Sequence, residues 1–284
     1  MLRRYYLTCA GKSDGGGAQV HAVCSALAFA HHHGMTYVHT PFNHIGHAGK
    51  MGTTLAAQWE RAFALGLGER QINEPAFAKM RRHPLTRGFQ LGKLSLKPTL
   101  LVAEHCHWFT NSHPQAYEAI RPRLIEKYRG TRHATPARDH LTVAVHVRRG
   151  DVNPIDWPHR FTRDEVILHQ VQQISAALGN RAHEIHLYSE GEPAQFEIFR
   201  ARANAILHLS EDVFDSIDAM IDADVLVMAK SSFSYVAALL SDAIKIYSPF
   251  QHPPLRDWIV SDAEGSFGAD GLGRAISNIS RSTK

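Results

Sequence analysis

The sequence predicts an α/β protein made of two Rossmann-like lobes, residues 1–138 and 139–284, whose parallel sheets face a cleft. Strand-length apolar runs alternate with helix-length runs, which is typical of parallel sheets covered by helices. Residues 130–140 are polar, contain Gly, Thr and Pro, and lack apolar periodicity, so we expect the linker there. The 284 residues, 44% of them hydrophobic, are enough for two domains of ordinary size.

The elements of the first lobe follow from short apolar runs and the turn residues between them. We expect strands and helices in the order strand 5–9, loop 11–17, helix 18–33, strand 36–39, helix 55–65, strand 99–104 and helix 115–128. Gly34 follows the first helix, and a glycine commonly ends a helix at this position. The first strand, helix and second strand form a βαβ unit, which requires parallel strands.

The second lobe shows a cleaner alternation. The expected strands are 141–147, 184–188, 205–209, 225–229 and 244–247, and the expected helices are 163–178, 194–202, 213–221 and 233–240. The first of these helices has its own start and stop signals. Thr162 with Glu165 three residues later resembles a capping box, and Gly179 is placed to end the helix.

The charge of the chain favours a small anionic ligand. Lys and Arg outnumber Asp and Glu by 31 to 27, which gives a net charge of +4 and a pI near 9.0. The basic residues are scattered and form neither the blocks nor the stripe that mark a nucleic-acid surface. We therefore expect a phosphate-bearing small molecule as the partner, and no nucleic acid.

No apolar run is long enough for a membrane helix, which needs about 20 residues. Residues 5–9 are too short for the core of a signal peptide and are soon followed by Gly11 and Lys12. We therefore expect a cytoplasmic protein without a transmembrane segment. Its cysteines, Cys9, Cys24 and Cys106, include no CxxC pair, so we expect them to be reduced and buried.

The strongest motif is the hexapeptide HVRRGD at residues 146–151, at the carboxyl end of an apolar strand. In a parallel sheet this end faces the ligand. His146 and Arg148 share one side of an extended strand, so we expect Arg148 to be aimed at the ligand and Arg149 to begin and brace the following turn. A guanidinium binds a diphosphate through two parallel hydrogen bonds and keeps its charge. The alternative is a surface turn in which Arg149 pairs with Asp151 and His146 is a packed strand residue.

Three segments together resemble the GDP-fucose fucosyltransferases, the family that includes bacterial α-1,2 enzymes and the α-1,6 enzymes of nodulation and N-glycan core modification. The hexapeptide resembles the donor-binding motif of that family. Residues 15–19 (GGGAQ) resemble its GGxGNQ loop, with Ala18 where an Asn usually stands. Residues 230–235 (KSSFSY) resemble its NSSFSW segment, with Lys230 and Tyr235 as departures. The order and spacing of the segments resemble those of an α-1,2-type enzyme.

The resemblance implies a GT-B fold and an inverting, metal-independent transfer of fucose from GDP-fucose to a hydroxyl of a saccharide acceptor, without a cofactor. It implies that His146 contacts the nucleoside and that Arg148 contacts the β-phosphate. Some relatives bind guanine through an Asp, and the matching position here lies next to Asp215. The other residues expected to bind substrate come from all three segments: Gly15, Gly16, Gly17, Gln19, Arg149, Ser231, Ser232 and Phe233.

The physical basis for two of these segments is the backbone. Ser231 and Ser232 open a helix after a strand, where free N–H groups and the helix dipole favour an anion, so a donor diphosphate is expected there. The alternative is that one serine is only the helix N-cap. Glycines at 15–17 permit the backbone to approach a ligand closely, although a glycine run alone is a weak signal.

The general base is expected to be a carboxylate, because it must remove a proton from the acceptor hydroxyl. In core-type relatives a Glu downstream of the motif has this role, and the resemblance transfers it to Asp156, which adjoins Trp157, an aromatic face suited to a sugar. An exposed turn is the structural alternative for Asp156. Asp151 and Asp14 are the other candidates.

Two patterns could indicate a metal. Asp222 and Asp224 form the pattern DxD, with which glycosyltransferases of another fold bind a metal ion. Here the two residues lie at a helix-to-strand junction, so we interpret them as the end of a helix. His105 and His107 would share one face of a strand, yet no HExxH and no third ligand at a recognisable spacing accompany them, so we expect no metal site. Two functions remain as alternatives: transfer from another nucleotide sugar, and nucleotide or glycan binding without catalysis.

Overall fold

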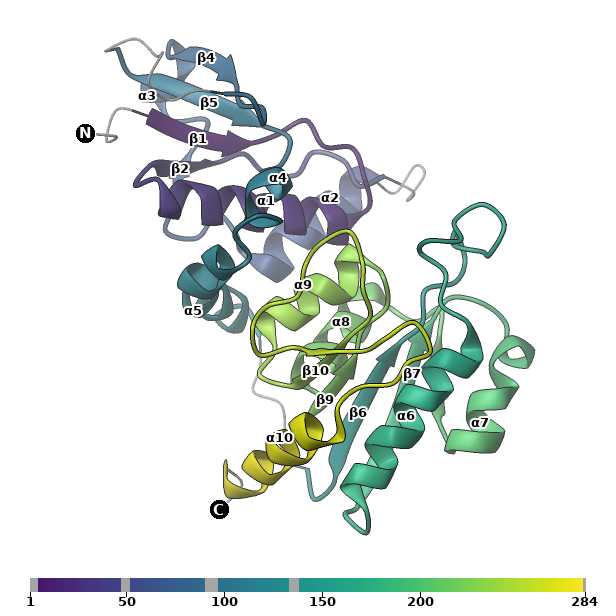
Figure 1. Ribbon diagram of the computed structural model, residues 1–284. Helices are drawn as coiled ribbons and strands as arrows, with labels where there is room; N and C mark the ends of the chain where they lie inside the picture. The colour runs from purple at the N-terminus through teal and green to yellow at the C-terminus, as the bar shows by residue number, and fades with distance from the viewer. Residues whose placement is uncertain (1–4, 47–51, 90–96, 133–137, 283–284) are drawn as a thin grey trace. The chain divides into compact units, whose positions relative to one another are not determined.

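The structure, a computed structural model, describes residues 5–46, 52–89, 97–132 and 138–282. The chain divides into two compact units, Met1–His133 and Ala134–Lys284. Each unit is built on its own parallel β-sheet (Figure 1). The α/β class with two parallel sheets that the sequence predicts is therefore confirmed.

The sheet of the N-terminal unit has the order β3-β2-β1-β5-β4 and is parallel throughout. Its strands are β1 (Tyr5–Cys9), β2 (Thr36–His39), β3 (Arg70–Gln71), β4 (Arg81–Pro84) and β5 (Thr99–Ala103). The two central strands are apolar, and Leu7, Leu100 and Leu101 are fully buried. Such continuous apolar runs are typical of parallel strands whose two faces are both covered.

The helices of the N-terminal unit are α1 (Gly16–His32), α2 (Gly52–Phe63), α3 (Pro75–Ala78), α4 (His107–Thr110) and α5 (Gln115–Arg129). α1 is buried along most of its length because it packs on β1 and β2 and also contacts α4 and α5. α2 buries one face, which carries Ala56, Trp59 and Phe63. Gly34 follows α1 with φ of +62°, as the sequence predicts.

The sheet of the C-terminal unit has the order β11-β10-β9-β6-β7-β8. Its strands are β6 (Leu141–His146), β7 (His183–Ser189), β8 (Ile206–Leu209), β9 (Val225–Val227), β10 (Ile244–Tyr247) and β11 (Ile259–Val260). From β6 the chain runs outward to β7 and β8, and then returns to the other side of β6 to form β9, β10 and β11. This is the strand order of a doubly wound Rossmann fold, and its topological switch point lies between β6 and β9.

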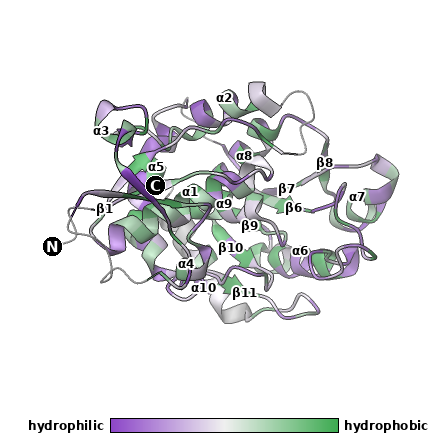
Figure 2. Ribbon diagram, turned by 90° about the horizontal axis from the view of Figure 1, so that it is seen from above, coloured by the Kyte–Doolittle hydropathy of each residue, from purple (hydrophilic) through white to green (hydrophobic). Residues whose placement is uncertain are grey.

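The helical elements of the C-terminal unit are α6 (Asp164–Leu178), the 3₁₀ turn η3 (Pro193–Phe196), α7 (Glu197–Ala203), α8 (Val213–Asp222), α9 (Ser232–Leu240) and α10 (Ala269–Ser282). α6 packs beside α7 and α10, and α8 packs on α9 (Figure 1). β9, β10 and α9 are largely apolar (Figure 2). The core of this unit therefore extends over the central strands of the sheet.

The alternation of side chains along β6 sets the direction of His146. Val143, Val145 and Val147 belong to the hydrophobic core that includes buried residues of α6 and α10. Because neighbouring strand residues point to opposite faces, His146 points to the other face of the sheet. There its ring meets Phe233 near the start of α9, with 5.5 Å between the ring centroids.

The structure corrects several sequence expectations. Thr162 is not an N-cap: α6 is capped by the backbone of Arg163, without a side-chain bond, and so the capping box is wrong, whereas Gly179 ends this helix with φ of +59°. The helix expected over 194–202 begins as a 3₁₀ turn. His105 and His107 do not share a strand, because β5 ends at Ala103 and His107 opens α4.

Other features of the chain agree with the expectations. Cys9, Cys24 and Cys106 are free and buried, and burial raises the pKa of the Cys9 and Cys24 thiols to about 12. Asp222 ends α8, and the carboxylate of Asp224 accepts a hydrogen bond of 2.8 Å from the backbone N–H of Thr142. Of the helices that lie in the described ranges, none combines the length and the apolar character needed to cross a membrane.

Candidate functional site

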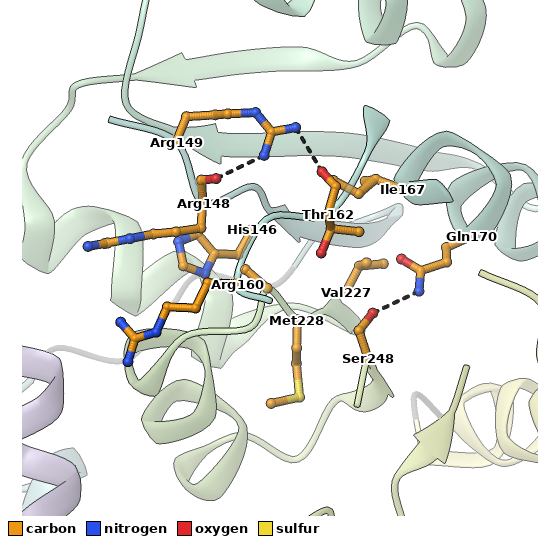
Figure 3. Close-up of a pocket in the computed structure, with 11 residues that line it drawn as sticks. His146, Arg148, Arg149, Arg160, Thr162, Ile167, Gln170, Val227, Met228 and Ser248 are labelled. Atoms are coloured by element: carbon orange, nitrogen blue, oxygen red, sulfur yellow. Dashed lines mark hydrogen bonds between the residues drawn. The ribbon is translucent and has the colours of Figure 1, made fainter. Parts of the chain in front are cut away.

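A small pocket lies at the switch point of the C-terminal unit (Figure 3). Residues from the ends of β6, β9 and β10, from the loop after β6 and from α6 line it: His146, Arg148, Arg149, Arg160, Thr162, Ile167, Gln170, Val227, Met228, Ala229 and Ser248. The carboxyl ends of the strands at a switch point leave room for a ligand, because the connections on either side lead away in opposite directions. The fold therefore brings the carboxyl ends of β6, β9 and β10 together around a candidate ligand site.

His146 is the last residue of β6 and is only 7% exposed. Burial, together with the positive charge of Arg148, lowers the pKa of His146 to about 3, so the ring is neutral at pH 7. Its Nδ1 atom is buried and has no hydrogen-bond partner among the described residues. A buried ring nitrogen without a partner is costly, so this atom is available to a ligand or a bound water.

Arg148 lies in the loop after β6 and extends past His146 (Figure 3). Its Nη2 donates to the carboxylate of Asp151 over 2.6 Å. Both side chains remain partly accessible, which makes this ion pair weak enough to exchange for a ligand anion. The structure therefore places the motif arginine and the candidate Asp151 together at the pocket.

Arg149 turns away from the other arginines, toward Thr162 (Figure 3). It donates to the carbonyl oxygen of Thr162 over 3.0 Å and pairs with Asp164 at the start of α6. Its guanidinium also lies over the ring of Phe161, 4.2 Å from the centroid. Arg149 also donates to the backbone oxygen of Arg148 over 2.8 Å, as expected of a residue that braces this turn. The expectation that Arg149 pairs with Asp151 is wrong, because β6 ends at His146 and the chain then bends, which lets Arg149 reach α6.

Arg160 is the charged pocket residue that the sequence motifs did not indicate. It comes from the far end of the same loop and extends to the same side of His146 as Arg148 (Figure 3). Its guanidinium lies 5.5 Å from the ring of Trp157 and 5.8 Å from the ring of Phe250. The only signal in the sequence is a cation between aromatic residues shortly after the arginine motif.

The pocket has an excess of positive charge. Arg148 and Arg149 each face one carboxylate, whereas Arg160 has no ion pair within the ranges that the structure describes. Deeper in the pocket, Gln170 is 1% exposed and donates to the hydroxyls of Ser248 and Ser261. The side-chain amide of Gln170 is therefore hydrogen-bonded within the protein, whereas the excess positive charge of the arginines is available to an anion.

The start of α9 adjoins this site through Phe233. Ser231 is the N-cap, and its hydroxyl accepts a hydrogen bond of 3.2 Å from the backbone N–H of Phe233. One of the two serines is therefore a helix N-cap, which was the alternative to a role in binding the diphosphate. Ser232 is the first residue of the helix. Lys230, half-buried just before the cap, has its pKa lowered by burial. None of these three residues lines the pocket itself.

The remaining candidates of this unit lie outside the pocket. Asp156 is exposed, and its carboxylate accepts a hydrogen bond of 2.7 Å from Asn153. The neighbouring Trp157 is 46% exposed. Asp215 is exposed in the first turn of α8, where Asp212 is the N-cap.

The glycine-rich loop belongs to the N-terminal unit and is held by packing. Gln19 is buried and donates to the backbone oxygens of Asp14 and His44 over 2.6 and 2.9 Å. A Cβ atom on Gly16 would lie 2.1 Å from the Trp59 ring, so this glycine is required by the packing of α1 against α2. Gly15 precedes α1 as its cap, and Gly17 is buried within it.

Comparison with known proteins gives distant similarities of structure. No family model matches the chain, and no curated protein matches it. The fucosyltransferase NodZ from Bradyrhizobium superimposes with a TM-score of 0.46 at 14% identity, covering 85% of this chain and 94% of NodZ. The E. coli heptosyltransferase WaaC gives a TM-score of 0.42 at 12% identity, covering 99% of this chain and 100% of WaaC. These similarities are too distant to assign the chain to a family or a reaction.

Proposed function

We propose that the chain is an inverting glycosyltransferase that moves fucose from GDP-fucose to a hydroxyl of a saccharide. The observation that carries the proposal is the pocket at the switch point, where a neutral, buried His146 lies beside arginines with an excess of positive charge. Such a site suits a ligand with an uncharged ring system and a diphosphate. The three segments that resemble GDP-fucose fucosyltransferases support GDP-fucose as the donor.

Binding of the donor would use His146 and Arg148 in different ways. The buried Nδ1 of His146 offers a hydrogen-bonding position for the nucleoside. Arg148 would exchange Asp151 for the diphosphate and stabilise the negative charge that develops on the leaving GDP. We propose that guanidinium groups supply this charge and that transfer needs no metal, since an arginine keeps its charge at any relevant pH.

The general base of the transfer is proposed to be Asp156. Its carboxylate is exposed, and its loop also carries Trp157, whose ring is open to a sugar. Asp151 is the second candidate, and its carboxylate pairs with Arg148 in the structure. Asp14 of the N-terminal unit is the third candidate and pairs with Lys12 over 3.3 Å.

The test of this function begins with ligand binding. GDP, UDP, ADP and their sugars should be compared by thermal shift, and we expect GDP and GDP-fucose to raise the melting temperature most, because only a bound ligand stabilises the fold by mass action. Release of GDP from GDP-fucose should then persist in excess EDTA. A larger shift with another nucleotide would indicate a different donor, and activity abolished by EDTA and restored by Mn²⁺ would contradict metal independence.

A second comparison separates catalysis from binding. Asp156→Asn should abolish transfer while GDP still raises the melting temperature, because the carboxylate is not part of the pocket. If Asp156→Asn and Asp14→Asn both leave turnover unchanged, neither residue is the base. If the wild-type protein binds GDP and never turns over GDP-fucose with any saccharide, the alternative of a non-catalytic binding protein holds.

A further inference from the structure

Arg160 differs from the other two arginines of the pocket in what surrounds its charge. Arg148 faces Asp151 and Arg149 faces Asp164, but no carboxylate lies within ion-pair distance of Arg160 among the described residues. Its Nε atom is also buried without a hydrogen-bond partner there. A buried donor on a charged group normally has an acceptor, because leaving it unmade costs more than for a neutral group.

The aromatic neighbours of Arg160 hold the guanidinium without using its donors. Trp157 comes from the same loop and Phe250 from the segment after β10. Both rings attract the cation through their π faces, and this attraction leaves the N–H groups in the guanidinium plane free to form a fork. The guanidinium of Arg160 can therefore use these N–H groups to bind a planar or tetrahedral anion.

A purely structural role for the Arg160 side chain has less support, because other bonds hold the loop. Backbone N–H groups of Arg160 and Phe161 donate to the carbonyl oxygen of Trp157 over 2.9 and 3.0 Å. The buried side chain of Val152 fixes the first part of the loop, and Arg149 fixes the last part through Thr162. The loop therefore keeps its fold without hydrogen bonds from the Arg160 side chain.

We propose that Arg160 is a substrate-binding residue that, together with Arg148, binds the diphosphate of the nucleotide donor. Both side chains extend to the same side of His146, whereas Arg149 is occupied at the start of α6 (Figure 3). The inference rests on the proposed function, since that function names the ligand. It predicts that Arg160 contributes to the binding of phosphate groups and not to the binding of the nucleoside.

The test is a calorimetric titration of the full chain with GDP, inorganic pyrophosphate and guanosine. Arg160→Gln is compared with Arg163→Gln, a matched control that removes the same charge three residues away, where the side chain is 59% exposed and pairs with Glu264. We expect Arg160→Gln to raise the Kd for GDP and pyrophosphate at least about tenfold, and Arg163→Gln to change it less than about twofold. The Kd for guanosine should stay within about twofold in both variants.

Arg160→Lys is a second variant, which keeps the positive charge but loses the two parallel hydrogen bonds that a guanidinium can donate. It should bind GDP more tightly than Arg160→Gln and less tightly than the wild type. Unfolding curves confirm that each variant is folded. If Arg160→Gln or Arg160→Lys binds GDP as tightly as the wild type, or loses guanosine to the same extent as GDP, the role assigned to Arg160 is wrong while the proposed function stands. If the wild type binds neither GDP nor pyrophosphate, both are wrong.

Discussion

The charge of a single residue, His146, depends on its position in the fold. Burial lowers its pKa to about 3, whereas a histidine in an unfolded chain titrates near 6.5. Between these two pH values the unfolded state binds more protons than the folded state. The free energy of unfolding is therefore unaffected by the titration of His146 above about pH 6.5, and it decreases as the pH falls from 6.5 toward 3.

Replacing His146 by Gln should remove this part of the acid sensitivity. Between pH 6 and pH 4 we expect the free energy of unfolding of the wild type to fall by about 1 kcal/mol per pH unit more than that of the variant. Urea unfolding at several pH values measures the difference. His169→Gln, at an exposed position on α6, should keep the wild-type slope. An identical slope for His146→Gln and the wild type would mean that His146 binds a proton equally well in the folded and unfolded states, which contradicts its lowered pKa.

The two motif arginines should differ when each is replaced by Lys. Arg148→Lys loses a forked contact where leaving-group charge develops, and should lower kcat/KM for GDP-fucose by about 30- to 1,000-fold, or 2 to 4 kcal/mol. Arg149→Lys loses bonds to Thr162 and Asp164 and should instead lower the free energy of unfolding by about 1 to 2 kcal/mol. Steady-state kinetics and urea unfolding of both variants measure this. A larger kinetic loss in Arg149→Lys would assign the phosphate contact to that residue.

At the scale of secondary-structure elements, the sequence predicts the regular α/β alternation well. β1, β2 and β10 have the predicted ends, because apolar runs bounded by turn residues mark buried strands clearly. The elements not predicted are mostly very short or near the end of the chain: β3, α3, β4, α4, β11 and α10. A strand of two residues or a helix of four has too few positions to show a period.

The site was predictable only where it depends on the sheet. His146 and the loop after it could be placed because they lie at the carboxyl end of a clearly apolar strand of the second lobe. The partners of Arg148, Arg149 and Arg160 could not be predicted, because they depend on the geometry of the loop and on contacts between residues distant in sequence. Thr162, for example, lies one residue before the N-cap Arg163, and its backbone oxygen accepts a hydrogen bond from Arg149.

The start of α1 allows a test of the glycine-rich loop. Gly16→Ala should lower the free energy of unfolding by about 1 to 3 kcal/mol, because its Cβ would lie 2.1 Å from the ring of Trp59. Gly88→Ala is the matched control, since nothing lies within 4 Å of its Cβ and its φ is not positive. Urea unfolding measures both. A Gly16→Ala variant as stable as the wild type would show that the packing against Trp59 tolerates a side chain and does not require a glycine at this position.

At the scale of the whole molecule, the two units share a parallel α/β architecture and differ in the chemistry at their strand ends. The C-terminal unit has an arginine-lined pocket at its switch point. In the N-terminal unit, the loop before α1 is fixed by Gln19 and by the contact of Gly16 with α2. These differences support our proposal that the donor nucleotide binds to the C-terminal unit.

Hydrogen exchange of the full chain with and without GDP tests this assignment most directly. We predict slower exchange with GDP at residues 146–150, 160–170 and 227–233, because these segments line or adjoin the pocket. Exchange at residues 11–17 should change much less. Protection confined to residues 11–17, equal protection of the two units, or no protection at a GDP concentration that saturates binding would contradict the assignment of the donor site.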